Sequence, residues 1–503
     1  MSQHTLQTSE FKYVNNYNLY KNSVLIIGAG PCGILSTKYI SQNNNVLCVD
    51  GKNDIGGLWK FEEINENNHP NLQADAFYNS YGVLQSSLYE DLQSNDCKSM
   101  MCFKGLPPNR EYLEFMYSDQ FYSYLQQYSQ KFNLKNYMTF NTFVQSVRLS
   151  KNLTQEEKSQ LSFNLTKRFL IKLVDSADYN SNIRFVQADQ VIVCNGHYSV
   201  PNYPNIENQQ IFNGDLIHMH YFRKSKVEKY ANRHLVIYGA GPSSLDVVLI
   251  LLKRQAQFKP SRITVIGQKN QIQAQQKSSC YTEEMQTQRL VYKTGFIQKF
   301  NSPSSILLDS GEIIENVDNI LYATGYQYSF PFLECNSQID NIIEFYNERK
   351  NSFGPLYKRM FAVREPNLIF IGCVSTVFQL QSCLERQAIV AQRYIDNHIQ
   401  LPSFEQMEES FKSDYEEACK ASHDGKTYLK TTTEENGLTD FKYTKQLQQL
   451  AQIPLDEDFE KIYKEIVYPT YIQLLSNGNY PKVKDLNFEQ LIGPDYSPEE
   501  GKF

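Results

Sequence analysis

The sequence lacks several features that would place it in whole classes of proteins. Its 503 residues hold 49 Lys and Arg against 55 Asp and Glu, a formal net charge of −6. Nucleic acid is therefore not expected as a partner, because phosphate binding needs clustered basic side chains. Apolar runs such as Val247–Leu252 are far shorter than the roughly 18–20 residues of a membrane-spanning helix. Residues 1–22 lack the basic start and apolar core of a signal peptide.

Cysteine and tryptophan are also sparse. The 10 cysteines are spread out without a C-x-x-C pair, so neither a disulfide framework nor a metal site is predicted. We therefore expect a soluble protein of the reducing cytoplasm without a membrane anchor. Trp59 is the single tryptophan. With 41% hydrophobic and 21% charged residues, disorder of the whole chain is excluded, and the length allows two to four domains.

A glycine-rich turn follows the first apolar run. Ser23–Ile27 predicts a buried parallel strand, Pro31–Ser41 a helix and Val46–Val49 a second strand, with Asp50 at its end. The turn between the first strand and the helix consists of Gly28, Ala29, Gly30, Pro31, Cys32 and Gly33.

Each element of this unit has a physical reason in a dinucleotide site. The first glycine permits the tight turn, the second lets the backbone approach a pyrophosphate, and the third lets helix and strand pack closely. The start of the helix supplies free N–H groups for phosphates. Asp50 would accept hydrogen bonds from a ribose with a free 2′-hydroxyl, as in FAD or NAD.

A second unit repeats this order with two differences. His234–Tyr238 predicts a strand, Leu245–Gln255 a helix and Arg262–Ile266 another strand. The turn contains Gly239 and Gly241 but has Ser244 in place of the third glycine. No acid follows the last strand, where Lys269 would favour the 2′-phosphate of NADP; the same residue also fits a solvated loop lysine.

Two similar segments bracket the second unit. Asp189–His197 and Asp318–Tyr326 share one pattern, a strand that ends in a glycine turn at Gly196 or Gly325. We therefore predict an α/β fold with two Rossmann-like domains, the NADP-binding domain being inserted into the FAD-binding domain. The predicted ranges are 20–205 and 318–400 for the FAD domain, 206–317 for the NADP domain, and 401–503 for a C-terminal helical extension. Within the first range, the polar stretch 151–184 predicts a surface excursion before a strand at Arg184–Val186.

Two shorter motifs complete the pattern. Gly56-Gly57-Leu58-Trp59 would bring backbone close to a ligand with a flat ring beside it, although a loop Trp can also fill a gap in a core. Phe212-x-Gly214-x-x-x-His218-x-x-x-Phe222 lies between the two nucleotide units. His218 could shuttle a proton there, or order the domain junction through hydrogen bonds.

Together these motifs resemble the flavin-containing monooxygenases, N- and S-oxygenating members of the class B flavoprotein monooxygenases. The resemblance covers about residues 20–395 and also includes Leu88–Phe103, Ala323–Tyr326 and Leu384–Ala388. Asp50 stands where the family usually has Glu, and Ser94 stands where Thr is commoner. Asp96 adds a charge beside Asn95.

The resemblance implies cofactors and site residues. FAD would be bound by the first glycine turn, Asp50, Gly57, Leu58 and Trp59. NADPH would be bound by residues of the second unit, namely Gly239, Gly241, Ser243, Ser244, Leu245, Asp246 and Lys269. Further cofactor-binding candidates are Ser94, Asn95, Asp96, Val144, Gly325 and Gln387.

The resemblance also implies the reaction. NADPH reduces FAD, oxygen adds to flavin C4a to give a hydroperoxide, and a small-molecule nucleophile, an amine, thiol or thioether, takes the distal oxygen. Asn95 is the catalytic candidate, hydrogen-bonding NADP+ and the hydroperoxide, because an amide offers a donor and an acceptor without a titrating proton. From its residue type alone, Asn95 equally fits a turn or cap. The resemblance is compatible with a homodimer.

Four alternatives remain open at this point. A disulfide reductase would need a cysteine pair at the flavin, and Cys97 and Cys102 have a permissible spacing but the wrong surroundings. A Baeyer–Villiger monooxygenase shares the cofactors, but its linker motif has Trp where Phe222 stands. An N-hydroxylase of amino acids or polyamines shares the segment that ends at Tyr326. A non-catalytic FAD-binding scaffold would not need Asn95 or a second glycine turn.

Overall fold

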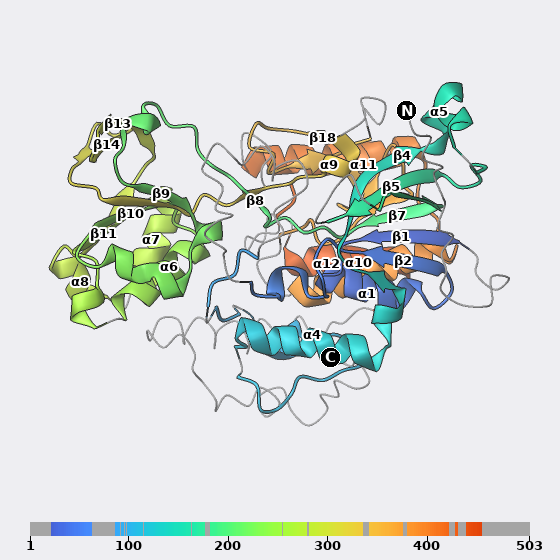
Figure 1. Cartoon of the computed structure of the whole chain (residues 1–503), viewed down its shortest axis with the longest axis horizontal. Coiled ribbons are helices and arrows are strands. Elements are labelled where there is room, and N and C mark those ends of the chain that lie inside the picture. Colours follow the sequence, from blue (N-terminus) through green and yellow to red (C-terminus); the bar gives the residue numbers. More distant parts are fainter. Residues whose placement is uncertain are drawn as a thin grey trace.

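The computed structural model consists of two lobes joined by a narrow connection (Figure 1). The large lobe is built on a seven-stranded sheet and the small lobe on a five-stranded sheet. The structure describes residues 22–62, 86–90, 92–94, 96, 98–113, 115–161, 163–176, 182–253, 255–278, 281–334, 342–375, 380–421, 428–430 and 439–454. None of the helices in these ranges is long and apolar enough to cross a membrane.

The sheet of the large lobe has the strand order β20-β21-β22-β7-β1-β2-β3. Its central strands β22, β7, β1 and β2 run parallel, which is the arrangement that a strand–helix–strand unit produces. The strands are β1 (Ser23–Ile27), β2 (Asn45–Val49), β3 (Met138–Thr139), β7 (Gln190–Val193), β20 (Leu356–Tyr357), β21 (Phe361–Ala362) and β22 (Leu368–Phe370).

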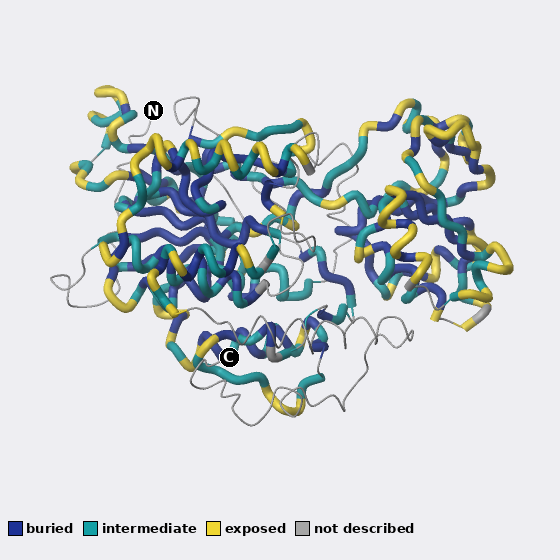
Figure 2. Tube along the Cα trace, turned by 180° about the vertical axis from the view of Figure 1, so that it is seen from behind, coloured by how far each residue is buried: buried dark blue, intermediate teal, exposed yellow. Residues whose placement is uncertain are grey.

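Both faces of this sheet are covered, so its strands consist almost entirely of buried apolar residues (Figure 2). Val24 and Ile26 of β1 belong to a core shared with helices α1 (Pro31–Ile40), α10 (Leu380–Ile395) and α12 (Asp440–Ala451). Leu25 and Ile27 point the other way, because side chains alternate along a strand. They join a second core with the antiparallel sheet of β4 (Thr142–Leu149), β5 (Phe169–Asp175) and β6 (Arg184–Ala188).

Other elements of the large lobe surround these layers. Helix α11 (Phe404–Ala421) packs on the second core through Phe411 and Ala418, and α4 (Ser118–Lys131) contributes Phe121 and Tyr124 to the first. The short elements are α3 (Lys98–Met101), α5 (Gln155–Ser159), α9 (Pro331–Glu334), β8 (Val200–Pro201), β17 (Tyr326–Gln327), β18 (Glu344–Phe345) and β19 (Phe353–Gly354).

The small lobe has a parallel sheet with the order β12-β11-β10-β16-β9. Helix α6 (Pro242–Leu252) lies against one face and a small antiparallel sheet, β13-β14-β15, against the other. The strands are β9 (Asp215–His218), β10 (His234–Tyr238), β11 (Arg262–Gly267), β12 (Leu290–Thr294), β13 (Ile297–Ser302), β14 (Ser305–Leu308), β15 (Ile313–Ile314) and β16 (Asn319–Tyr322), and the further helices are α7 (Lys269–Ser278) and α8 (Thr282–Gln286).

The predicted α/β fold with one dinucleotide unit inside another is confirmed. The chain enters the small lobe after β8 and leaves it before β17, and these two strands pair with each other at the connection. The proposed domain boundaries themselves stay a prediction. The strand after the predicted boundary at residue 318 is β16, which pairs with β10 and β9 of the small lobe.

Several predicted bounds differ from the structure, and two of these differences have a physical reason. Helix α6 begins at Pro242, three residues earlier than predicted, because the missing N–H of proline costs nothing in the first turn of a helix. The prediction of a surface excursion over 151–184 is wrong in its second half, where β5 forms a buried central strand. Its alternate polar residue Lys172 and the preceding polar stretch obscured the apolar run in the sequence.

Two buried histidines lie where the lobes meet. His218 and His220 are both fully buried, and Nδ1 of His218 accepts a hydrogen bond from the His220 backbone N–H at 3.0 Å. Neither ring nitrogen of His220 has a hydrogen-bond partner within the described part of the chain. Burial lowers the pKa of each imidazole to about 3, and for His220 the nearby positive charges of Arg223 and Lys52 act in the same direction.

We predict that Gly33→Ala destabilises the FAD-loaded protein by about 3 kcal/mol or more. A Cβ at Gly33 would lie 1.8 Å from the carbonyl oxygen of Gly28, so α1 would have to move away from β1. The matched control is Gly241→Ala, because no atom lies within 4 Å of a Cβ at that position. Urea unfolding measures both variants, and a Gly33→Ala protein as stable as the control would contradict the packing argument.

We predict that stability falls as pH falls from about 6.5, partly because of His220. In the unfolded chain a histidine titrates near 6.5, whereas the folded protein holds His220 neutral down to about pH 3. Between these values the unfolded state binds more protons, so acid favours unfolding. His220→Gln should therefore flatten the loss of unfolding free energy between pH 7.5 and 5. The exposed His398 supplies the control, His398→Gln, and an unchanged slope in His220→Gln would refute the prediction.

Candidate cofactor and active site

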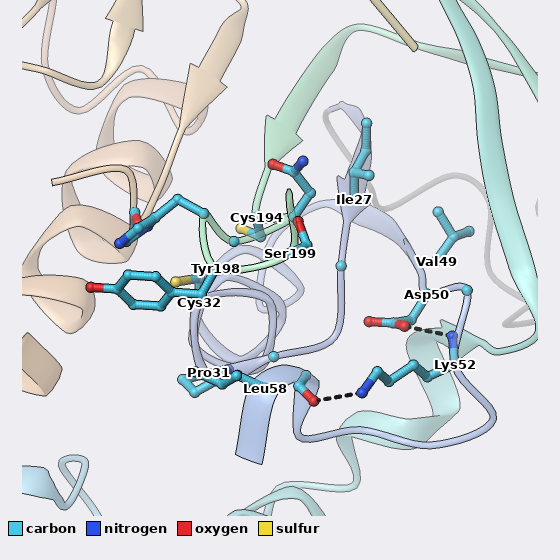
Figure 3. Close-up of a pocket in the computed structure, with 18 of the residues that line it drawn as sticks. Ile27, Pro31, Cys32, Val49, Asp50, Lys52, Leu58, Cys194, Tyr198 and Ser199 are labelled. Carbon is cyan, nitrogen blue, oxygen red and sulfur yellow. Dashed lines mark hydrogen bonds between the residues drawn. The ribbon is translucent and has the colours of Figure 1, made fainter. Parts of the chain in front are cut away.

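A cavity of about 260 Å³ opens at the carboxyl ends of β1, β2 and β7, beside the start of α1 (Figure 3). In an open parallel sheet this edge is the usual place for a ligand. Asp50 and Lys52 lie on one side of the cavity, and Cys32 and Tyr198 on the other. The predicted cofactor-binding residues that line it are Gly28, Gly30, Pro31, Cys32, Asp50, Gly57, Leu58, Trp59 and Val144.

The two glycine turns of the large lobe meet at the bottom of this cavity. Gly28 has φ +103°, and a Cβ there would lie 2.5 Å from the carbonyl oxygen of Cys194. A Cβ at Gly57 would lie 2.9 Å from Cα of Gly30, so the two turns touch backbone to backbone. Gly30 caps α1 without a side-chain hydrogen bond, which leaves the first N–H groups of the helix for an anion.

Asp50 connects the glycine turn to β2. Its Oδ2 accepts a hydrogen bond from the Ala29 N–H at 2.6 Å. Its Oδ1 accepts one from the Lys52 N–H at 2.8 Å (Figure 3). Burial raises the pKa of this carboxyl group, while these backbone hydrogen bonds oppose the shift. Lys52 Nζ in turn donates to the Gly57 carbonyl at 3.2 Å and pairs with Glu62 at 3.2 Å. The acid is thus fixed at the cavity rim by the turns it faces.

Trp59 lines the cavity, and Ala29 and Gly33 of the first glycine turn are buried next to it. Trp59 meets Phe121 of α4 edge to face, with ring centroids 4.7 Å apart. Ala29 is fully buried and reaches the cavity only through its N–H bond to Asp50. Gly33 lies beneath the turn, against the Gly28 carbonyl. These residues shape the site without lining it, apart from the Trp59 ring itself.

Two further predicted residues lie behind or beside the cavity. Gln387 is fully buried, and its Oε1 accepts a hydrogen bond from the N–H of Gly372, which lines the cavity, at 3.0 Å. Gly325 has φ +80° and accepts a bond from Asn202 at the connection between the lobes. Neither residue is among the described residues that line the cavity, and their part in cofactor binding stays a prediction.

Ser94 and Asp96, the described residues on either side of Asn95, are not among the residues that line the cavity. Ser94 is buried, and its Oγ donates to the Asp96 carbonyl at 2.8 Å. The Ser94 N–H donates to the Met116 carbonyl at 2.8 Å, which ties Ser94 to the large lobe. The catalytic candidate Asn95 lies outside the described residues, as does Cys97 of the possible cysteine pair.

The cavity also contains residues that the motifs did not single out. His197 and Tyr198 line it next to Gly196, and His197 Nδ1 lies 3.0 Å from the Gly372 carbonyl. Burial lowers the pKa of His197 to about 4. The repeated strand–glycine pattern pointed to this turn in the sequence, although it did not distinguish the side chains after it. Lys52 and Gln381 had no such signal.

The second glycine turn opens the small lobe's helix α6. Gly239 has φ +117°, and a Cβ there would lie 2.2 Å from the carbonyl oxygen of Ala323. Gly241 caps α6, and the space at its Cβ position is open. A ligand can therefore come close to the backbone at this position. Ser243 is exposed beside it, and Leu245 is half-buried one residue beyond Ser244.

The two departures from the glycine pattern have clear positions. Ser244 is fully buried; its Oγ donates to the Gly241 carbonyl at 2.7 Å and accepts from Gln275 Nε2 at 2.7 Å. Its hydroxyl thus stabilises the turn. Lys269 is exposed at the start of α7, two residues after the end of β11. Asp246 lies one turn into α6, where its Oδ2 accepts a hydrogen bond from the Tyr89 hydroxyl.

The residues present fit a dinucleotide in each lobe. In the large lobe, a backbone-lined turn, a helix start without a side-chain cap and a half-buried carboxylate bound to the turn meet in one cavity. The small lobe repeats the turn and the uncapped helix start, with a lysine instead of the acid. The large lobe matches FAD, and the small lobe matches a nicotinamide dinucleotide.

Comparisons with known proteins agree with this arrangement. The family model described as flavin-binding monooxygenase-like matches residues 21–263, and that of pyridine nucleotide-disulphide oxidoreductases matches residues 180–354. Senecionine N-oxygenase of Tyria jacobaeae is 24% identical over 386 residues, covering 76% of this chain and 74% of that protein. Flavin-containing monooxygenase FMO GS-OX-like 8 of Arabidopsis thaliana is 24% identical over 451 residues, covering 88% of each.

A solved structure shares the fold. S-allyl-L-cysteine S-oxygenase from Allium sativum aligns with a TM-score of 0.67 and 19% identity, covering 91% of this chain and 98% of that one. The motifs, the two-lobed architecture and these matches all point to one family. The chain is therefore similar to the flavin-containing monooxygenases over most of its length, and it is an oxidoreductase that uses FAD and NADPH.

Proposed function

We propose that this protein transfers one oxygen atom from a flavin C4a-hydroperoxide to a nucleophilic nitrogen or sulfur of a small molecule. Bound FAD would supply the oxygen chemistry, and NADPH the two electrons. The observation that carries the proposal is the cavity of the large lobe, in which a half-buried acid and two touching glycine turns face largely apolar walls. Such walls exclude water, which would otherwise promote the loss of hydrogen peroxide before the substrate reacts.

The roles of the chain's own residues follow from their positions. Asp50 would hold the ribose of FAD, and the free N–H groups at the start of α1 would hold its phosphates. The exposed Ser243 and the cap at Gly241 would meet the phosphates of NADPH, and Lys269 would meet its 2′-phosphate. Ser244 supports this turn from beneath.

Asn95 is proposed as the catalytic residue on the strength of its motif. A side-chain amide can donate one hydrogen bond and accept another without exchanging a proton at neutral pH. It would thus orient NADP+ and the reactive oxygen without providing an acid that releases peroxide. The adjacent Asp96 adds an acidic side chain, which favours substrates that carry a cationic group besides the nucleophilic atom.

Oxygenation of ketones is the second candidate, and the linker argues against it. Phe222, where ketone-oxidising relatives have Trp, is buried in the small-lobe core and meets Tyr89 edge to face at 5.7 Å. A larger indole would require repacking of this core. The relatives named above act, by their names, as an N-oxygenase and an S-oxygenase. A homodimer is compatible with the proposal but plays no part in it.

The proposed function predicts a particular order of spectral changes. NADPH should bleach the flavin without air, and oxygen should then give a long-lived flavin species that absorbs near-UV light. Amines, thiols and thioethers should shorten its lifetime and yield one oxygenated product per NADPH, while a ketone should not. Stopped-flow absorbance, with product and peroxide measured in parallel, provides the test. Direct reoxidation to FAD with one peroxide per NADPH would overturn the proposal, and ester formation from the ketone would favour the second candidate.

We predict that Asn95→Ala separates the two half-reactions. Flavin reduction by NADPH should proceed at a similar rate, but product per NADPH should fall at least about tenfold, because loss of a single positioned donor often costs 10²–10³ in such sites. Asn164→Ala changes an exposed asparagine of the large lobe and serves as the control. If Asn95→Ala gives as much product as the control, the catalytic role of Asn95 is wrong.

A further inference from the structure

One segment of the large lobe is held by both lobes. We call the described residues 86–90, 92–94 and 96 the strap; it contains the predicted site residues Ser94 and Asp96. At its beginning Ser86 lines the FAD cavity, and its Oγ donates to the carbonyl of Leu58, another lining residue. The strap therefore starts at the flavin site, and its contacts show where it goes from there.

In its middle the strap enters the core of the small lobe. Tyr89 is only 4% exposed and belongs to the same buried cluster as Val247 and Val248 of α6. Its ring meets Phe222 edge to face, with centroids 5.7 Å apart. Leu92 packs against the same cluster. A tyrosine from the FAD lobe thus forms part of the core beneath the NADP-binding helix.

Polar contacts fix this insertion. The Tyr89 hydroxyl donates to Asp246 Oδ2, one turn into α6. Glu90 accepts hydrogen bonds from the backbone N–H groups of Lys224, at 2.6 Å, and Ser225, at 3.2 Å. The buried Arg223 donates from Nη2 to the Ser86 carbonyl at 2.9 Å. The small lobe therefore forms hydrogen bonds with three residues of the strap, Ser86, Tyr89 and Glu90.

At its far end the strap returns to the large lobe. The Ser94 N–H donates to the Met116 carbonyl at 2.8 Å, and the Ser118 N–H donates to the Leu92 carbonyl at 2.9 Å. Gln93 Nε2 donates to the Phe115 carbonyl at 3.1 Å. Only a few residues separate Tyr89 in one lobe from Ser94 in the other. Because the connecting chain is so short, Tyr89 cannot move far without moving Ser94 as well.

We propose that Tyr89 is a positioning residue that couples the NADP-binding helix to the oxygenation site. Asp246 then serves as the acceptor that holds Tyr89, and not as a ligand of NADP. When NADP+ binds at the start of α6, the helix would hold Tyr89 more firmly, and the strap would be stiffened as far as Ser94. This inference rests on the proposed function, because it takes α6 as the NADP-binding helix.

The test is hydrogen–deuterium exchange of FAD-loaded, oxidised protein with and without NADP+, followed by mass spectrometry of peptides from the strap. NADP+ should slow exchange of the strap at least about threefold in the wild-type protein. In Tyr89→Phe, which keeps the ring but loses the hydroxyl, NADP+ should still bind with a Kd within about threefold, while the slowing disappears. Equal slowing in Tyr89→Phe and wild type would overturn the inference.

A matched control and a second variant separate the explanations. Tyr322→Phe removes another small-lobe hydroxyl, which donates to Gln209 at 3.3 Å, and should keep the slowing. Asp246→Ala should lose the slowing as Tyr89→Phe does, again with little change in Kd, and the double variant should lose no more. A large loss of NADP+ affinity in Asp246→Ala alone would identify Asp246 as a ligand and overturn the inference. A wild-type protein that does not bind NADP+ would overturn the proposed function as well, whereas binding and oxygenation without slowing would overturn the inference alone.

Discussion

The large lobe depends on one close contact, that of the Gly33 backbone with the carbonyl of Gly28. This contact sets the distance between α1 and β1. It therefore also sets where the free N–H groups at the start of α1 lie relative to the carboxyl edge of the sheet. Asp50 can then reach the turn from β2, and the turn at Gly56 and Gly57 can lie directly on the first glycine turn. A side chain at any of these places would separate layers that the cofactor needs in register.

The small lobe solves the same problem with different chemistry. Its third turn position is Ser244, whose buried hydroxyl is satisfied by the Gly241 carbonyl and by Gln275. A buried hydroxyl without such partners would destabilise the fold, so Gln275 is part of what makes the substitution acceptable. The two lobes therefore share a backbone plan, but only the first holds an acid against its turn. The difference suits two dinucleotides with different ribose groups.

Prediction from the sequence succeeded where local pattern and packing demand the same residue. Strands β1 and β10 have the bounds that their apolar runs indicate, and the turn after each strand falls at its glycines. Nine of the predicted cofactor residues line one cavity. These successes have a common cause. Where the backbone must turn tightly beside a ligand, the sequence has glycine, and glycine is easy to recognise.

The remainder depended on contacts between distant parts of the chain. Nothing near Tyr89 indicates that it belongs to the core of another lobe, because an apolar residue has the same appearance wherever it is buried. The strand β5 was missed because it pairs on both sides with strands that its own residues do not specify. Gln387 stays a predicted cofactor-binding residue, and the sequence did not reveal its hydrogen-bond partners because they lie 15 and 56 residues away.

Those partners of Gln387 give the C-terminal helices a consequence for the flavin. Gln387 bonds the cavity-lining Gly372 with its oxygen, and its Nε2 donates to the hydroxyl of Tyr443 on α12 at 2.8 Å. Tyr443 is itself fully buried and donates to the Lys358 carbonyl at 3.0 Å. A chain shortened before α12 would leave a buried amide donor unsatisfied directly behind the cavity wall. Helix α12 lies in the part of the sequence whose pattern predicted least, yet through Tyr443 and Gln387 it supports the wall of the cofactor cavity. Shortening the chain there would therefore affect the cofactor site.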